Sequence, residues 1–222
     1  MKFSIIIPAL NEAESIENTL FPLQYLRKLG HEIILVDGGS RDATCFISRP
    51  LVSKLLSSEP GRARQMNLGA SISTGNVLLF LHADTSLPEN LEGIFAGLKI
   101  KSFWGRFDLS LTGTQYIYRL IEKMINLRSR LSGIATGDQV IFMTRDLFDR
   151  VNGFPDIPLM EDIAVCKKLK TISSPVCISA RVITSSRRWE SRGAIKTILL
   201  MWKLRMQYAM GVPPEKLANQ YE

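Results

Sequence analysis

The 222-residue chain has few cysteines and no long uncharged apolar run. Its three cysteines are an odd number without a C-x-x-C pair, so neither a disulfide framework nor a zinc site is indicated. No stretch approaches the ~18 uncharged apolar residues that a membrane-spanning helix needs. The N-terminal apolar run is interrupted by Pro8, Asn11 and Glu12 and lacks the cleavage site of a signal peptide. We therefore expect a cytosolic protein with reduced thiols.

Signatures of nucleic-acid binding are missing as well, although the formal net charge is +7. A basic balance suits nucleic acid, an anionic bilayer or a small phosphorylated ligand. Without zinc-finger spacing, an aromatic RNA-binding signature or a long basic run, nucleic acid is the least favoured of the three. The hydrophobic fraction of 45% and the charged fraction of 22% are those of an ordinary globular protein, so disorder is not expected.

The first half of the chain alternates buried-strand and helix patterns. Apolar, β-branched runs such as FSIIIPAL and EIILVD are typical of strands covered on both faces. The expected strands span 3–10, 32–37, 51–56 and 75–84, and the expected helices span 16–26, 42–48, 61–73 and 86–98. Capping boxes are expected at Asn11 with Glu14 and at Ser86 with Glu89. This alternation indicates a parallel sheet with right-handed crossovers.

The second half has a mixed pattern. Strands are expected over 103–111, 137–144 and 176–184, and helices over 116–131, 145–151, from about 161, and from 193. The last of these helices is strongly apolar over 193–210 and carries Lys196 and Lys203. We expect it to form core or a dimer face, or else to lie at a membrane interface with its lysines toward the lipid headgroups.

Polar clusters follow the carboxyl ends of three expected strands. They are Pro8 to Glu12, Asp37 to Ser40, and His82 to Asp84. In parallel sheets, ligands bind beyond the carboxyl ends of the strands. The three clusters are therefore expected on one rim, and together they indicate a site more strongly than any one of them.

The HAD triplet is a candidate metal site. In an extended strand, residues two apart point to the same side, so His82 and Asp84 are expected to converge on one ion or phosphate. A carboxylate suits Mg²⁺ or Mn²⁺ that also holds a diphosphate. The alternative is structural, with Asp84 starting a turn and His82 satisfied at the strand end. The neighbouring clusters favour the ligand role for Asp84, and less clearly for His82.

The DGGS sequence suits contact with a nucleotide. Gly38 and Gly39 permit positive φ and close approach of the backbone to a ligand, and Asp37 can accept hydrogen bonds from a base or ribose. A tight strand–helix turn capped by Ser40 explains the same residues, and the two roles are compatible. Because the pattern is not GxGxxG, a dinucleotide-binding fold is not indicated.

Charged pairs elsewhere each allow two interpretations. Arg62 and Arg64 open a helix whose N-terminus attracts anions, and for each a site role and a solvated position are equally favoured. Glu161 and Asp162 suit a general base or an ordinary acidic first turn, and the turn is the commoner case.

Asp138 with Gln139 is ambiguous between a turn and a substrate-binding loop. Arg188 beside Trp189 suits a phosphate or sugar site, or a basic surface loop with one anchored aromatic side chain.

Six motifs in order resemble family 2 glycosyltransferases with the GT-A fold: SIIIPALNE, EIILVDGGSRDAT, GRARQMNLGA, GNVLLFLHADT, MED and RRW. The resemblance covers nearly the whole chain. GRARQMN and HADT are most similar to a small stand-alone bacterial subgroup, some of whose members are associated with arsenosugar biosynthesis. The resemblance to family 2 glycosyltransferases implies an α/β fold with a Rossmann-like, mostly parallel sheet flanked by helices. It also implies one domain over 1–222, with a nucleotide-sugar half at 1–100, an acceptor and catalytic half at 101–192 and a helical segment at 193–222.

The resemblance also implies roles for individual residues. Asp37 matches the aspartate that reads the base, usually uracil. Asp84 matches the last Asp of D-x-D, which coordinates Mn²⁺ or Mg²⁺ on the diphosphate. Asp162, with Glu161 beside it, matches the catalytic base. The expected nucleotide-binding set is Pro8, Ala9, Asn11, Glu12, Asp37, Gly38, Gly39, Arg62, His82, Ala83 and Asp84. Asp138, Gln139, Arg188 and Trp189 are expected on the acceptor and diphosphate side, where Arg188 and Trp189 match the end of Q-x-x-R-W.

Two departures from the family's pattern qualify these roles. His82 stands at the first Asp of D-x-D, so metal coordination rests on Asp84 alone or with help from His82. Ser185 stands where Q-x-x-R-W, a motif associated with processive enzymes, has Gln. We therefore expect transfer of a single sugar rather than polymer synthesis.

The resemblance thus implies metal-dependent, inverting transfer of one sugar from a UDP- or GDP-sugar to a hydroxyl acceptor. One alternative is a sugar-phosphate nucleotidyltransferase, which would normally show a glycine-rich loop with basic residues, unlike PALNEAES. Another is an inactive nucleotide-binding or membrane-scaffolding protein, for which His82 is the best argument. We expect a cytoplasmic location, with peripheral contact at the inner membrane face or a homodimer formed through the 193–210 helix.

Overall fold

The computed structural model describes residues 1–98 and 100–221, and over these residues eight strands form one sheet in the order β3-β2-β1-β4-β7-β6-β8-β5. β1 (Phe3–Ala9) pairs in parallel with β2 (Glu32–Asp37) and β4 (Val77–Phe80), and β3 (Lys54–Ser57) continues the parallel part beside β2. The predicted mostly parallel α/β sheet is confirmed.

The other side of the sheet mixes directions, as predicted for the second half. β7 (Ile141–Thr144) is antiparallel to both β4 and β6 (Trp104–Leu111). β8 (Val176–Thr184) is parallel to β6, and the short β5 (Thr85–Ser86) is antiparallel to β8. Strands from both halves of the chain therefore share one sheet.

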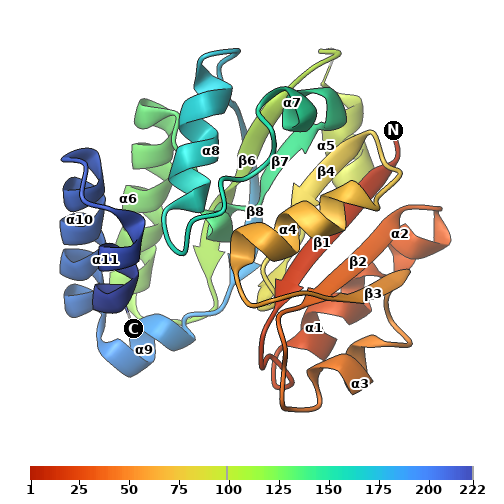
Figure 1. Cartoon of the computed structure of the whole chain (residues 1–222), viewed down its shortest axis with the longest axis horizontal. Coiled ribbons are helices and arrows are strands. Elements are labelled where there is room, and N and C mark those ends of the chain that lie inside the picture. Colours follow the sequence, from red (N-terminus) through yellow and green to blue (C-terminus); the bar gives the residue numbers. More distant parts are fainter. Residues whose placement is uncertain (99, 222) are drawn as a thin grey trace.

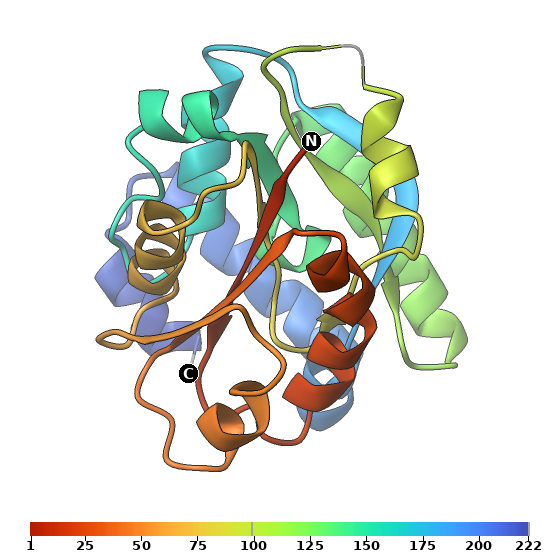
Figure 2. The same ribbon diagram turned by 90° about the vertical axis from the view of Figure 1, so that its right-hand side faces the viewer.

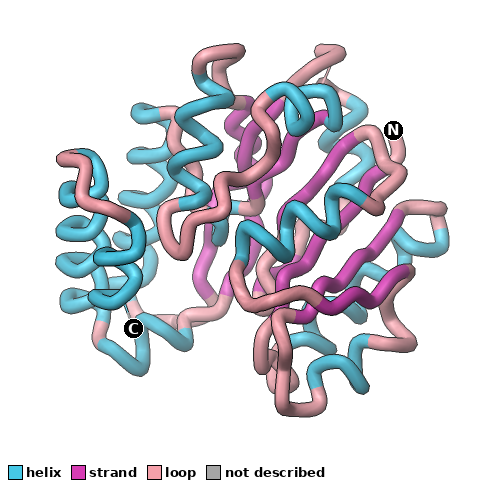
Figure 3. The backbone as a smooth tube through the Cα atoms, viewed as in Figure 1, coloured by secondary structure: helices cyan, strands magenta, loops and turns pink. Residues whose placement is uncertain are grey.

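Helices cover both faces of the sheet (Figures 1 and 3). Their bounds are α1 (Ile16–Leu20), α2 (Gln24–Lys28), α3 (Thr44–Ser48), α4 (Arg62–Ser71), α5 (Leu91–Ala96), α6 (Tyr116–Ser132), α7 (Arg145–Arg150), α8 (Glu161–Lys170), α9 (Arg187–Arg192), α10 (Ala194–Ala209) and α11 (Pro214–Tyr221), with short 3-10 turns η1 (Phe21–Leu23) and η2 (Gly137–Gln139). In Figure 2, α4 lies on one side of β1, and α1 and α2 lie on the other.

Three groups of buried side chains correspond to these layers. One face of the sheet packs against α1, α2, α5 and α6, and the other packs against α4, α7 and α8. A smaller group joins α10 and α11 to the start of α8. All seven residues of β1 are buried, because alternate side chains enter the two opposite cores.

Three local predictions about element ends were wrong. The strand predicted over 75–84 ends at Phe80 and does not include the HAD residues. The alternation rule of an extended strand therefore does not apply to His82 and Asp84. Asn11 does not cap a helix: it has φ 54°, and α1 begins at Ile16. Ser86 lies in β5, and the cap of α5 is Asn90, whose side chain accepts a hydrogen bond from the Gly93 N–H.

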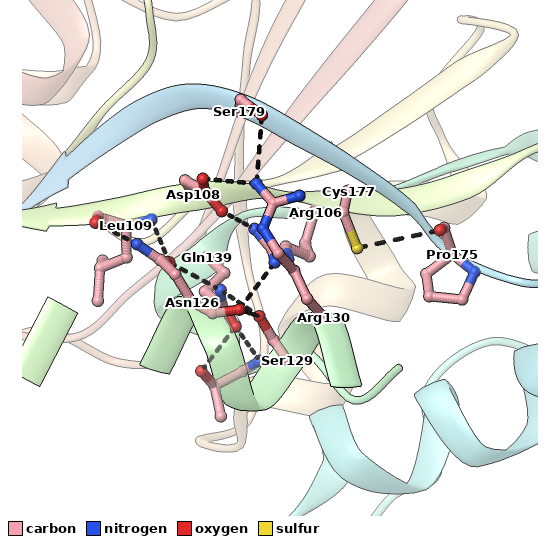
Figure 4. A network of polar contacts seen from close by, with 11 residues as sticks. Arg106, Asp108, Leu109, Asn126, Ser129, Arg130, Gln139, Pro175, Cys177 and Ser179 are labelled. Carbon is pink, nitrogen blue, oxygen red and sulfur yellow. Dashed lines mark hydrogen bonds and ion pairs between the residues drawn. The ribbon is translucent and has the colours of Figure 1, made fainter. Parts of the chain in front are cut away.

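A buried polar network fixes α6 to the sheet (Figure 4). The Arg106 side chain, only 1% exposed, contacts Asp108 and donates to the Asn126 carbonyl at 3.1 Å. Asn126 in turn pairs with both backbone groups of Leu109, at 2.8 and 3.0 Å. Arg130 reaches Asp108 at 2.6 Å from the outer side. α6 is therefore held by specific bonds as well as by apolar packing.

Among the described residues, no helix is both long enough and apolar enough to cross a membrane.

Candidate active site

A small pocket opens where β1 and β4 end and α8 begins. It is lined by Pro8, Arg62, Met66, Phe80, His82, Gly137, Ile141, Phe154, Glu161 and Asp162. These residues come from six separate segments of the chain. The pocket therefore lies at the carboxyl edge of β1 and β4, where the rule for parallel strands predicted a ligand site.

The loops after β1 and β2 are joined by hydrogen bonds. The Asn11 N–H donates to Ser40 Oγ at 2.8 Å, and the Asn11 side chain accepts from the Arg41 N–H at 2.9 Å. Asp37, buried at the end of β2, accepts from the N–H groups of Gly39 and Ser40 at 3.0 Å. Asp37 thus shapes the DGGS turn, although the residue before α3 is Ala43 and not the predicted cap Ser40. Oδ2 of Asp37 already accepts two hydrogen bonds, and Oδ1, which accepts one at 3.3 Å, can still accept another.

Gln65 is a structural residue of this edge that sequence reasoning missed. Its buried amide donates to the carbonyls of Ala9 and Val36, each at 2.8 Å, and so joins the ends of β1 and β2. A Cβ at Gly38 would lie 3.1 Å from the same amide nitrogen, which explains the small residue there. Gln65 sits inside the GRARQMN motif, but no spacing rule marks it.

Arg62 and Arg64 have different environments. Nε of Arg64 donates to both carboxylate oxygens of Asp156 on the surface, at 2.9 and 3.0 Å. Arg62 Nη2 donates to Nε2 of His82 at 3.1 Å, and its Nη1 lies 3.5 Å from a Glu161 carboxylate oxygen. Of the two arginines, Arg62 belongs to the pocket.

His82 faces Arg62 and Gly137. Because arginine only donates, Nε2 of His82 is the acceptor, and the ring is neutral with its proton on Nδ1. Burial, followed by the charges of Arg62 and Arg188, holds the pKa of His82 well below its usual value. A Cβ at position 137 would lie 2.5 Å from Nε2, so only glycine allows this approach. With this lone pair occupied by Arg62, Nε2 is not available as a metal ligand.

Glu161 and Asp162 open α8, preceded by Met160 at φ 71°. Asp162 accepts from the Gly137 N–H at 3.0 Å and from the Ile163 N–H at 2.7 Å. Burial raises the pKa of Asp162 despite these bonds. Burial, then the charge of Asp162, raises the pKa of Glu161 to about 7. The α8 N-terminus therefore presents one oriented carboxylate and one that protonates near neutral pH.

Asp84 has Glu12 and Arg187 as neighbours, and it shares with His82 the nearby charge of Arg188. Its carboxylate accepts one long hydrogen bond, from Thr85 Oγ1 at 3.4 Å. Burial, then the negative charge of Glu12, raises its pKa, while Arg187 acts in the opposite direction. Arg187 also pairs with Glu12 at 3.1 Å. Asp84 and Glu12 together therefore form a negatively charged place where a divalent cation is favourable.

The described protein side chains near Asp84 and Glu12 do not form a complete metal-coordination site. Across residues 1–98 and 100–221, no three His, Cys, Asp or Glu side chains gather closely enough to hold a metal ion. A cation here would depend on Asp84 and on oxygens brought by a ligand, as Mg²⁺ sites with substrate phosphates do.

Two arginines on the far side of Asp162 were not predicted as site residues. Removal from water, then the charge of Arg205, lowers the pKa of Arg128 to about 10, while Asp138 and Asp162 raise it. Burial also lowers the pKa of Arg205, and Asp162 and Asp138 act in the opposite direction. Among the described residues, Arg205 makes no hydrogen bond or ion pair. One carboxylate oxygen of Asp138 is buried without a hydrogen-bond partner. No motif marks these arginines, because α6 and α10 meet the site only in the folded chain.

The predicted acceptor-side residues have different roles. Gln139 was predicted incorrectly as a site residue: it is fully buried, donates to Ser129 Oγ at 3.0 Å and forms a capping box with Thr136. Trp189 packs against the main core and so anchors α9, while Arg188 is exposed and stacks on the Tyr221 ring with a 4.7 Å separation. The T-x-x-Q spacing was the sequence signal for the structural role of Gln139.

Known proteins similar to this chain are glycosyltransferases. Residues 4–100 match the model of glycosyl transferase family 2. A PGL/p-HBAD biosynthesis glycosyltransferase of Mycobacterium tuberculosis is 38% identical over 94 residues, which cover 39% of this chain and 37% of that protein. The matched part of this chain therefore spans well under half the length of that relative.

Solved structures extend the similarity to the remaining elements. A mannosyltransferase of Pyrobaculum calidifontis, in complex with GDP-Man and Mn²⁺, has a TM-score of 0.67 at 20% identity, covering 99% of this chain and 68% of that one. TarS of S. aureus in complex with UDP has a TM-score of 0.67 at 19% identity, covering 83% of this chain and 60% of that one. The resemblance is confirmed in its fold and in the family model: the chain has the GT-A glycosyltransferase fold, and residues 4–100 match the model of glycosyl transferase family 2.

Proposed function

We propose that the chain is a glycosyltransferase that moves one sugar, with inversion, from a nucleotide diphosphate sugar to an acceptor hydroxyl. The observation that carries this proposal is the setting of Asp162. Its raised pKa makes it a stronger base than an ordinary aspartate, and the Gly137 N–H orients it in the same pocket as Arg62 and His82.

In the proposed reaction, Asp162 accepts the proton of the acceptor hydroxyl as its oxygen attacks the anomeric carbon. That bond forms as the bond between the anomeric carbon and the diphosphate oxygen breaks, which inverts the configuration. The departing diphosphate gains negative charge, and Arg62 is the arginine of the pocket placed to stabilise it. Glu161 pairs with Arg62 and so positions it.

The donor is proposed to be a UDP- or GDP-sugar bound by residues 1–100. UDP and GDP-Man are the ligands in the two solved neighbours, which supports this class of donor. The loops joined by Asn11 and Asp37 form the proposed nucleotide-binding surface. In this proposal, residues 101–192 contribute the acceptor side, and the helices α10 and α11 border it.

A divalent cation, Mn²⁺ or Mg²⁺, is part of the proposal. Asp84 would hold it, because this carboxylate is partly buried beside Glu12 and accepts a single long hydrogen bond. Such an ion would neutralise charge on the diphosphate. Mn²⁺ is present in the Pyrobaculum neighbour.

The experiment that tests the function is a donor-turnover assay with UDP- and GDP-sugars, with and without Mn²⁺. Release of nucleoside diphosphate supports sugar transfer chemistry. Release of pyrophosphate would instead identify a sugar-phosphate nucleotidyltransferase, and binding without turnover would identify an inactive nucleotide-binding protein. NMR of the first product anomer separates inversion from retention.

A further inference from the structure

The α6 and α10 helices expose two long apolar faces. On α6 these residues are Tyr116, Leu120, Met124, Leu127 and Leu131, and on α10 they are Ile195, Leu199, Trp202, Met206 and Met210 at its C-cap. Each is between 37% and 95% exposed. Within each helix they follow at three or four residues, so they lie on one side of it. We call these ten residues the apolar face.

Every other exposed side chain of the two helices is basic, apart from Ala209. They are Lys123 and Arg130 on α6, and Lys196 and Lys203 on α10. Both helices are described throughout, and their one acidic residue, Glu122, is buried and paired with Arg119 at 2.7 Å. Within the two helices themselves, the apolar face is therefore flanked by basic side chains alone, unlike an ordinary surface helix, whose exposed positions mix both charges.

We propose that the apolar face docks on an anionic lipid bilayer. Interfacial helices combine an apolar face carrying aromatic and leucine side chains with flanking Lys and Arg that reach anionic headgroups. Trp202 and Tyr116 supply the amphipathic rings that favour the headgroup level. An exposed apolar surface of this extent marks an interaction site in a water-soluble domain.

Charge complementarity decides between a bilayer and a second copy of the chain. In a symmetric dimer through this face, the lysines and arginine of one border would meet those of the other, and like charges across an interface oppose association. An anionic bilayer instead supplies the opposite charge to every one of them. No acidic side chain on α6 or α10 is exposed to reverse this preference.

The same helices border the candidate site. Arg128 of α6 and Arg205 of α10 both interact electrostatically with Asp138 and Asp162. Docking through α6 and α10 would therefore bring the acceptor side of the pocket to the lipid surface. Resting on the proposed function, this arrangement favours an acceptor hydroxyl carried by a membrane lipid.

The test is sedimentation of the full chain with vesicles, without any donor. We expect binding to vesicles of phosphatidylglycerol and phosphatidylcholine and much weaker binding to pure phosphatidylcholine. Leu127→Glu with Leu199→Glu should abolish binding. Lys196→Glu with Lys203→Glu should weaken it by about fivefold or more for each lysine.

Matched control variants use exposed residues elsewhere. Phe46→Glu on α3 alters a side chain that is 84% exposed, and Lys28→Glu on α2 reverses an exposed charge. Both should bind vesicles as the unaltered chain does. Circular dichroism verifies that every variant is folded.

Tryptophan fluorescence reports the contact independently of sedimentation. Trp202 is 57% exposed, whereas Trp104 is fully buried, so anionic vesicles should shift the emission to the blue. Trp202→Phe should remove most of that shift while sedimentation persists.

The proposal is overturned if neither vesicle sediments the chain at low ionic strength, or if the Leu127→Glu, Leu199→Glu variant still binds. It is also overturned if light scattering finds a dimer that this variant dissolves, because the face would then lie between copies. These assays contain no nucleotide sugar, so failure of donor turnover in the absence of vesicles would be a separate result.

Discussion

Arg62 and Arg64 lie two residues apart in one helix but serve different parts of the molecule. Arg62 contacts His82 and Glu161 in the pocket, whereas Arg64 pairs with Asp156 at the surface. Residues two apart on a helix do not share a face, which is why the sequence favoured the two roles equally for each. Only their partners in the folded chain distinguish them.

Replacing Arg62 by Ala should lower kcat/KM for the nucleotide sugar by about tenfold to a thousandfold, because a cation that stabilises the departing diphosphate is lost. Steady-state kinetics of nucleoside diphosphate release measure the effect. Arg64→Ala is the matched control and should stay within about twofold of the unaltered chain, since exposed ion pairs contribute little. Equal losses in both variants would remove Arg62 from the proposed site.

Glu161 makes the stability depend on pH. Its folded pKa of about 7 lies above the ordinary value of 4.5, so the folded chain keeps a proton that the unfolded chain releases between these values. The free energy of unfolding should therefore fall as pH rises through this window. The Glu161→Gln variant has no carboxyl to titrate and does not show this decrease. Between pH 4.5 and about pH 8, its free energy of unfolding should rise relative to that of the unaltered chain by on the order of 2–3 kcal/mol.

Urea denaturation at the two pH values measures the difference. A gap between variant and unaltered chain that is the same at both pH values would contradict the raised pKa of Glu161.

Part of the candidate site could be predicted from strand ends, and part only from the family resemblance. His82 follows the end of a strand, whereas Arg62 and Asp162 stand at helix starts, where the residues alone also allowed structural roles. All three line one pocket. The alternation rule of an extended strand does not place His82 and Asp84, because both residues follow the end of the strand at Phe80. Their convergence on one ion or phosphate stays a prediction. Arg205 could not be found, since its site role comes from tertiary placement and not from a local pattern.

Among helices and strands, α4 shows how packing fixes the site. Its Gly69 lies so close to β1 that a Cβ would be 2.5 Å from the Ile6 side chain. This approach lets the start of α4 deliver Gln65 and Arg62 to the carboxyl edge.

Gly69→Ala should therefore lower the free energy of unfolding by about 1–3 kcal/mol through overpacking. Gly97→Ala at the end of α5 is the control: its nearest atom would be 3.6 Å away and its φ is −71°, so a small change is expected. Denaturant titration measures both. If Gly69→Ala is as stable as Gly97→Ala, the close contact of α4 with β1 is not as described.

Element types were more predictable than element ends. The strand β1 is recognisable from its continuous apolar run, because both of its faces are buried. The helix α6 is recognisable from its amphipathic spacing, because only one side of it is buried. Caps were less predictable, because several Ser, Asn and Asp residues near a helix start compete for one position. Asn90 rather than Ser86 begins α5 for this reason.

For the whole chain, one sheet joins the proposed nucleotide side to the proposed acceptor side through the β4–β7 pair. A nucleotide bound at the carboxyl edge should therefore stabilise the folded molecule. At a concentration about 100-fold above Kd, UDP or GDP with Mn²⁺ should raise Tm by about 5–10 °C.

The part of this shift that needs Mn²⁺ should disappear in Asp84→Asn and persist in Asp149→Asn, an exposed aspartate on α7. Differential scanning fluorimetry measures both. A Mn²⁺-dependent shift that survives Asp84→Asn would place the cation elsewhere.

The central claim is that Asp162 is the base of a sugar transfer, and its most direct test is the turnover number of Asp162→Asn. Asparagine preserves the shape and can still accept from the Gly137 N–H, but it cannot take up the acceptor proton. We predict that kcat for transfer falls by about 10²–10⁴-fold, while Asp149→Asn retains the activity of the unaltered chain. Transfer by Asp162→Asn at a near-native rate would contradict the assignment.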